Sequence, residues 1–359
     1  MHPNFYNDIV TDSNKKLKRG NSYASHIYLR IFSSGSKYYD RGGFGDAPTT
    51  FAASTLNSAS FSIRSVKVAP KPPAGFNPVT ASNKALEHYG FPTRPTHLAR
   101  LKAWTAAVFH AKHEVAPNPI LGRQYIGRPR SQTFGLSGTS YGEWAGYTDI
   151  GSDGGNIKHD NTYANWDVSS IPGDSSYANS EWETDPTVGF WTGIGGATSN
   201  SDSIIHAGTA DIATTIPQYR CWTEDYPDDP VYEGPVINPE DEVFVEVTYN
   251  GDGTTSYFLE NTSTGNYSSF TNSTPYYDDT SADFVAEVKG AYLPDFYSTE
   301  FTNCSTMWSN GTASGNFDDQ AYEKVIMTNS GTSGGTIMAE PGGVNTGNDG
   351  FAVDWINYA

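Results

Sequence analysis

The stretch DEVFVEVTYNGDGTTSYFLEN, residues 241–261, predicts a β-hairpin. Apolar and polar residues alternate along 241–249, a period of two that is typical of a strand with one buried face. Asn250-Gly-Asp-Gly253 follows as a turn, because asparagine and glycine tolerate the positive φ angles of tight hairpins. The alternation resumes at 255–259. We therefore expect two antiparallel strands joined by a short turn.

Similar alternation predicts further strands at 186–194, 203–209, 282–288 and 322–328. Helical periodicity is almost absent after residue 115, whereas glycine, serine, threonine and asparagine are frequent. Many short strands joined by tight turns are typical of a β-sandwich or a β-barrel. The sequence therefore predicts an all-β fold for this part of the chain.

Charge divides the chain near residue 140. The 359 residues carry a formal net charge of −18. Residues 1–140 contain 18 Lys+Arg and 6 Asp+Glu, a net of +12, and the remainder contains 4 and 34, a net of −30. An acidic domain repels phosphate backbones, so nucleic acid is not expected as a partner. No run approaches the roughly 18 apolar residues of a membrane-spanning helix, so no membrane partner is expected either.

We expect three parts along the chain. Residues 1–71 are basic, lack sustained periodicity and are expected to be loop or disorder, and residues 1–20 contain no apolar stretch of the kind found in a signal peptide. Residues 72–139 carry two helical patterns. Residues 140–359 form the predicted β domain.

The first helical pattern begins at Ser82 or Asn83 and ends at Tyr89, before Gly90. The second covers 97–113, where apolar residues recur at spacings of three and four. Its other face carries the basic residues Arg100, Lys102 and Lys112. A basic amphipathic helix beside an acidic domain favours docking on that domain, and the alternative is a solvated face on an unrelated small domain.

Cysteine and histidine give few signals. Cys221 and Cys304 could form one disulfide, and two free buried thiols are an equally good interpretation. His110 and His113 lie three residues apart, without the glutamate of a metalloprotease helix, so we predict no metal site. No glycine-rich loop precedes a helix in the way that phosphate binding requires, and no cofactor is predicted. The remaining candidates for chemistry lie on predicted strands: Trp144, Trp191, His206, Trp222, Glu224 and Glu287.

These residues lie in sequence blocks whose order carries a resemblance. The blocks include EWAGY (143–147), FWTGIGG (190–196), SIIHAGT (203–209), YRCWTEDYP (219–227) and ADFVAEV (282–288). In this order, over roughly residues 140–359, the chain resembles the glutamic peptidases, or eqolisins. The segment 72–113 resembles the pro-region of that family. The resemblance implies a concanavalin-like sandwich of two antiparallel sheets and an extracellular, acid-acting endopeptidase that uses no metal and no cofactor.

The resemblance places the family's catalytic glutamate on Glu287. In the period-two pattern, Asp283, Val285 and Glu287 share one face of the strand, and the residues between them share the other. A carboxylate on such a face can act as a base that polarises a water molecule for attack on a peptide carbonyl. Such attack needs no covalent intermediate.

The family's catalytic glutamine falls on His206, which is a departure from the pattern. Histidine can donate an N–H to a developing oxyanion, and in acid solution it is a cation. The same positive charge would weaken a neighbouring carboxylate as a base. Three outcomes stay open at this stage: an active peptidase with an altered pH profile, a much slower one, or a protein that binds peptide or glycan without cleaving it.

By resemblance, the substrate-binding residues are Trp144, Trp191, Trp222 and Glu224, and Gly195 stands where family members often carry aspartate. Protein or peptide substrates are expected, bound by a monomer. We also expect the basic helix at 97–113 to lie over the acidic substrate groove near neutral pH as an intramolecular inhibitor. Its release in acid would follow from protonation of the carboxylates.

Overall fold

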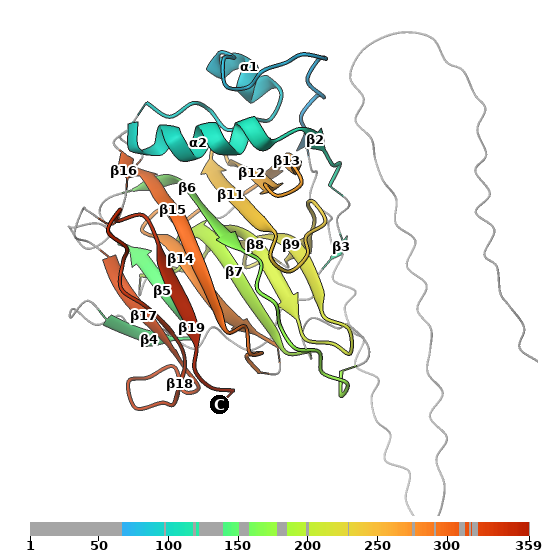
Figure 1. Ribbon diagram of the computed structural model, residues 1–359. Helices are drawn as coiled ribbons and strands as arrows, with labels where there is room; N and C mark the ends of the chain where they lie inside the picture. Colours follow the sequence, from blue (N-terminus) through green and yellow to red (C-terminus); the bar gives the residue numbers. More distant parts are fainter. Residues whose placement is uncertain are drawn as a thin grey trace, which may run out of the picture. The chain divides into compact units, whose positions relative to one another are not determined.

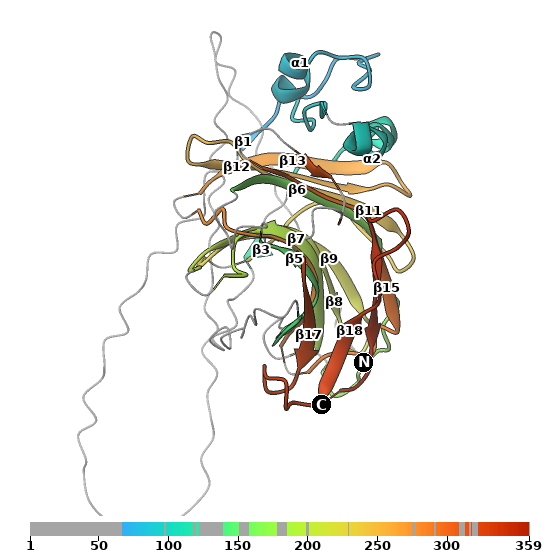
Figure 2. The ribbon, with the colours of Figure 1, turned by 90° about the vertical axis from the view of Figure 1, so that its left-hand side faces the viewer.

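The structure is a computed structural model (Figure 1). It describes residues 67–358, with gaps at 97, 118–119, 122–138, 151–157, 178–184, 199–200, 229, 275–276, 291, 309–312, 316 and 318–321. The expectation for residues 1–66 lies outside these described residues. The described chain is mostly β, and its strands form one hydrogen-bonded sheet that folds into two layers packed face to face (Figure 2). We call each layer a sheet below, and the predicted all-β sandwich is confirmed.

One sheet, which we call the concave sheet, curves away from its partner in Figure 2. In order of hydrogen bonding it contains β3 (Ile120–Leu121), β10 (Val231–Tyr232), β9 (Gln218–Tyr226), β8 (Ile204–Ile212), β7 (Thr187–Ile194), β14 (Ala282–Lys289), β5 (Trp144–Asp149) and β17 (Tyr322–Thr328). These neighbours are antiparallel, and β4 (Thr139–Gly142) runs parallel to β17.

The other sheet, which we call the helix-covered sheet, has antiparallel neighbours in the order β19 (Phe351–Trp355), β15 (Ser298–Trp308), β6 (His159–Asp167), β11 (Glu242–Tyr249), β12 (Thr254–Asn261) and β13 (Asn266–Ser273). The outer edge of β13 pairs with β1 (Lys67–Val68) and β2 (His113–Glu114), and β15 pairs with β16 (Ala313–Gly315). Strand β18 (Ile337–Pro341) pairs with both β17 and β19 and so joins the two sheets.

The hairpin predicted at 241–261 is β11 and β12. Its register runs from Val243 opposite Asn261 to Tyr249 opposite Thr255. The turn closes with a hydrogen bond from the Asn250 N–H to the carbonyl of Thr254 (2.9 Å). Gly251 and Gly253 take φ angles of 76° and 80°, which explains why glycine occupies these positions. The other four predicted strands are also present, within a few residues of their expected ends.

The main core lies between the two sheets and is aromatic at its centre. Phe301 stacks on Phe351 at 5.1 Å, and Phe190 meets Phe296 edge to face at 5.2 Å. Cys221 and Cys304 are both buried in this core as free thiols. Of the two interpretations that the sequence left open, the structure therefore supports two free thiols and not a disulfide. No disulfide joins them, and aromatic packing holds the sheets together.

The N-terminal segment forms two helices that lie on the outer face of the helix-covered sheet (Figure 2). Helix α1 (Asn83–His88) is capped by Ser82, whose hydroxyl accepts the N–H of Ala85 (3.3 Å). Helix α2 (Leu98–His110) buries Trp104 and Val108 in a second apolar cluster. The sheet contributes four outward-facing aromatic rings to this cluster: Tyr163, Phe244, Phe258 and Tyr267.

Two expectations for the second helix are corrected. The helix ends at His110 and not at residue 113, because the N–H groups of Lys112 and His113 both donate to the carbonyl of Gly265 and lead the chain into β2. The helix also does not lie over the acidic concave face. Its apolar residues dock on aromatic rings of the opposite sheet, and Arg100 from its basic face is buried there, over the ring of Tyr163 (4.6 Å).

Among the described residues, no helix is long and apolar enough to cross a membrane. Within the same residues, no group of three or more His, Cys, Asp or Glu side chains is arranged to hold a metal ion.

Candidate active site

The predicted site residues gather on the concave face, the side of the concave sheet that faces away from the main core. On β14, Phe284 and Ala286 belong to the main core, whereas Val285 belongs to a separate cluster with three tryptophans. The predicted division of this strand into two faces is therefore confirmed. Glu287 shares the face of Val285 and stands opposite Trp144 of β5 and Gly189 of β7.

The carboxylate of Glu287 is held at one oxygen. Its Oε2 accepts a hydrogen bond from the indole Nε1 of Trp191 (3.0 Å) and lies 2.9 Å from the ammonium nitrogen of Lys289. The side chains of Glu287 and Lys289 keep 13% and 15% of their surface exposed. The described polar contacts thus use Oε2, and the carboxylate is restrained without being sealed from solvent.

His206 lies deeper and is paired with Glu224. The ring nitrogen Nδ1 lies 3.1 Å from the backbone carbonyl of Glu224, and Nε2 lies 3.3 Å from its Oε2. A carbonyl only accepts, so Nδ1 is the donor in the first contact, and Nε2 faces the carboxylate. The two side chains, 2% and 5% exposed, form a buried pair.

Three tryptophans surround these charged groups. Trp144 meets Trp191 edge to face at 4.9 Å, and the His206 ring lies between Trp191 and Trp222 at 4.7 and 4.9 Å. Trp191 contacts His206 with its ring and Glu287 with its N–H, so it links the two residues. The structure thus brings together all six residues that the sequence singled out.

Lys289 is a site residue that sequence reasoning missed. Period-two alternation along β14 puts it on the face of Glu287, and this was the available signal. Burial opposes its charge, but the neighbouring carboxylates, Glu287 foremost, raise its pKa above the ordinary lysine value. Its ammonium group also lies 5.8 Å from the ring centre of Trp222, a cation–π contact.

The structure explains why glycine stands at position 195. Gly195 has a φ angle of 89°, and a Cβ atom there would lie 2.6 Å from the carbonyl oxygen of Asp278. An aspartate would be strained and would collide with the loop before β14. The backbone at position 195 therefore favours glycine over the aspartate that the family resemblance suggests.

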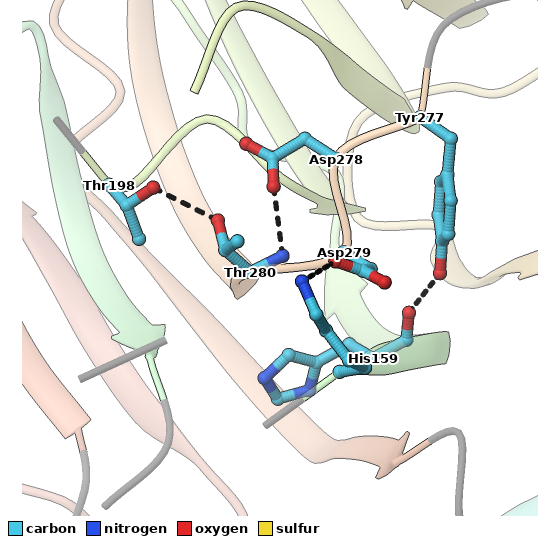
Figure 3. Close-up of polar contacts among 7 residues, drawn as sticks. His159, Thr198, Tyr277, Asp278, Asp279 and Thr280 are labelled. Atoms are coloured by element: carbon cyan, nitrogen blue, oxygen red, sulfur yellow. Dashed lines mark hydrogen bonds and ion pairs between the residues drawn. The ribbon is translucent and has the colours of Figure 1, made fainter. Parts of the chain in front are cut away.

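Polar contacts fix the loop that leads into β14 (Figure 3). The hydroxyl of Tyr277 donates to the carbonyl of His159, Asp278 accepts the N–H of Thr280 (3.0 Å), and Thr280 shares a hydrogen bond with Thr198 (3.0 Å). This loop connects β6, the end of β7 and the start of β14. It therefore fixes the strand that carries Glu287 and Lys289.

The family model for the Peptidase A4 family matches residues 142–339. The chain therefore belongs to this family of glutamic peptidases, as its sequence blocks predict. Family and fold indicate a glutamic-type peptidase, a hydrolase of peptide bonds.

Among solved structures, the chain is similar to scytalido-glutamic peptidase with a transition state analog inhibitor, with 22% identity over 60% of this chain and 98% of that one (TM-score 0.48). It is also similar to SCP-B of the eqolisin family in complex with the tripeptide Ala-Ile-His, at 21% identity over the same shares (TM-score 0.44). Aspergilloglutamic peptidase from Aspergillus niger shares 25% identity over 47% and 99% of the two chains (TM-score 0.39). No curated protein matches the chain significantly in sequence.

Proposed function

We propose that the protein is an acid-acting endopeptidase in which Glu287 activates the attacking water. The observation that carries this proposal is the restrained carboxylate of Glu287, whose Oε2 is held by Trp191 and Lys289 while the side chain stays 13% exposed. A base held in one geometry, with its other oxygen available to a water, is what general-base catalysis requires.

The reaction conserves its protons as follows. Glu287 takes a proton from water while the water oxygen bonds to the carbonyl carbon, and the carbonyl oxygen becomes an oxyanion. Glu287 then gives this proton to the peptide nitrogen, the C–N bond breaks, and an acid and an amine leave. One residue acts first as the base and then as the acid, and no covalent intermediate forms.

His206 stands in the place of the family's glutamine. In this proposal, Glu224 orients the His206 ring, and the ring keeps Trp191 in contact with Glu287. The oxyanion then forms in a site with little water, where the charges around it act strongly.

The substrate in this proposal is an extended segment of a protein or peptide that lies along the concave face. Trp144, Trp191 and Trp222 offer apolar walls, and Glu224 offers a polar anchor. By family resemblance, the enzyme acts outside the cell. In this proposal it acts as a monomer. Inhibition by α2 is not part of the proposal, since that helix docks on the other sheet.

Glu287→Gln tests the proposal, because an amide of the same shape cannot accept the proton. We expect it to abolish cleavage of denatured casein between about pH 2 and 7 while the unfolding midpoint stays close to that of the unaltered protein. Undiminished cleavage by this variant would refute the role of Glu287. Glu340→Gln is the matched control, because it removes a glutamate that pairs with Lys324 (2.7 Å) away from the site, and we expect full activity.

His206→Gln is the companion variant, because it restores the family's residue. Higher activity in this variant would indicate that the histidine slows a working enzyme. Lower activity would indicate that the pair with Glu224 contributes to catalysis.

A further inference from the structure

We propose that the ammonium group of Lys289 stabilises the oxyanion, taking over the hydrogen bond that the family's glutamine amide supplies. This inference rests on the proposed function, and it assigns to a residue two positions beyond the base a role that the sequence gave to His206.

His206 and Lys289 direct their hydrogen-bond donors differently. An oxyanion-stabilising donor must point at the oxygen as charge develops on it. Both ring nitrogens of His206 face Glu224, at 3.1 and 3.3 Å, so its N–H groups are directed at that residue. Lys289 directs its Nζ at the carboxylate of Glu287, at 2.9 Å. An ammonium group has three hydrogens, so one can stay on Glu287 while another meets the substrate oxygen.

The two residues also differ in their access to a bound substrate. His206 and Glu224 are 2% and 5% exposed, and the His206 ring lies between the rings of Trp191 and Trp222. Lys289 and Glu287 are 15% and 13% exposed. A peptide carbonyl that approaches the water on Glu287 therefore reaches Lys289 before it could reach the histidine.

The charge of Lys289 also suits it to stabilise an oxyanion. Lys289 lies among the carboxylates of Glu287, Glu224 and Glu143, which oppose loss of its proton. It enters the reaction as a cation and leaves it as one, because it donates a hydrogen bond and transfers no proton. The moving proton belongs to Glu287, so the two roles are separate. A fixed cation in a half-buried site acts more strongly on an oxyanion than the same cation in water.

The principal test replaces Lys289 with methionine, which keeps much of the side-chain length and removes the charge. We expect Lys289→Met to lower kcat/KM for a chromogenic peptide by about a hundredfold to a thousandfold, mostly in kcat, as loss of one oxyanion donor does elsewhere. Lys324→Met is the matched control, since it removes a lysine from another Lys–Glu pair of the sandwich. We expect it to keep full activity.

Two further measurements separate catalysis from folding. A peptidyl phosphinate mimics the tetrahedral oxyanion, and calorimetry should show that Lys289→Met loses affinity for it by about the same factor, while affinity for the neutral peptide changes severalfold at most. Alkylation of a Lys289→Cys variant with 2-bromoethylamine rebuilds an ammonium group and should restore most of the lost kcat. Burial raises the pKa of Cys221 to about 12 and that of Cys304 far above its ordinary value, so we expect both thiols to stay unmodified.

The results for these variants distinguish failure of the Lys289 role from failure of the proposed function. Unchanged kcat/KM in Lys289→Met, or an equal loss of affinity for phosphinate and neutral peptide, would overturn the role of Lys289. If Glu287→Gln cleaves as well as the unaltered chain, the proposed function itself fails. If Glu287→Gln is inactive and Lys289→Met is not, only the present inference fails.

Discussion

At the scale of single residues, the sheet that carries the site contains two glycines of β7 with very different surroundings. A Cβ atom at Gly193 would lie 2.4 Å from the Cβ atom of His206 and 2.8 Å from the carbonyl oxygen of Ile205. At Gly189 the nearest atom would be 3.6 Å away, on the ring of Trp222. The first position has no room for a methyl group, and the second has ordinary contact distances.

We therefore expect Gly193→Ala to destabilise the fold by about 1–3 kcal/mol and to lower activity, because it displaces His206 from Glu224. Gly189→Ala is the matched control and should change the free energy of unfolding by less than about 0.5 kcal/mol. Urea unfolding and casein cleavage of both variants would check this. Equal stability of the two variants would contradict it.

The site residues differ in how far the sequence could predict them. Glu287 and the three tryptophans lie in blocks that follow the family pattern, and their common face follows from alternation along the strands. Lys289 obeys the same alternation, and its ion pair joins it to Glu287, its neighbour on the same face of β14. The pairing of His206 with Glu224, in contrast, arises from the register of β8 and β9, which periodicity alone does not specify.

At the scale of elements, α2 is an integral part of the sandwich and not a cover for the site. Trp104 is 2% exposed, and its Nε1 donates to the carbonyl of Pro92 (2.9 Å). The hydroxyl of Tyr163, on β6, donates to the carbonyl of Arg100 (3.2 Å). Apolar packing and directed hydrogen bonds thus hold the helix on the helix-covered sheet.

Trp104→Ala should lower the free energy of unfolding by about 3–5 kcal/mol, the usual cost of deleting a large buried ring. Phe109→Ala, on the same helix but with its side chain 66% exposed, should cost less than about 0.5 kcal/mol. Urea unfolding followed by circular dichroism gives both values. If Trp104→Ala costs no more than Phe109→Ala, the helix does not contribute to the stability of the fold.

The docking side of α2 illustrates the limit of sequence periodicity. Helical spacing identifies the apolar face of the helix but not the surface that it covers. Charge pointed to the acidic concave face, whereas burial of apolar area favoured the aromatic outer face. The available signal was Phe244 and Phe258, which put rings on the outer side of β11 and β12, where simple alternation expects polar residues.

At the scale of the whole molecule, buried carboxyl groups link stability to acidity. Burial raises the pKa of Asp211 to about 8, although the Ser169 hydroxyl donates to it (2.5 Å). Burial, reinforced by Glu242, raises the pKa of Glu260 to about 9. In an unfolded chain both groups ionise near pH 4.

The raised pKa of Asp211 makes the folded state less stable as pH rises. Below about pH 4, both states hold the proton of Asp211, and its contribution is fully present. Between about pH 4 and 8 only the native state holds it, so stability falls as pH rises, by up to ~1.4 kcal/mol per pH unit for this group. These two buried carboxyl groups therefore favour the folded state in acid.

Asp211→Asn should flatten this dependence, because an amide has no proton to lose. Urea unfolding at pH 4, 6 and 8 should show a smaller fall in stability than in the unaltered protein. Asp354→Asn is the matched control, since it removes an exposed carboxylate that also accepts from a serine, Ser298 (2.7 Å). An unchanged slope in Asp211→Asn would contradict the assignment.

The short strands of the N-terminal segment have a consequence for solubility. Strands β1 and β2 occupy the outer edge of β13, and β3 occupies the outer edge of β10. A free strand edge presents unpaired N–H and C=O groups to which another chain can add. A chain shortened to begin at residue 122 would bare both edges together with four outward aromatic rings. We expect such a chain to self-associate at concentrations where the full chain stays dispersed, because residues 67–121 cover both edges and the rings.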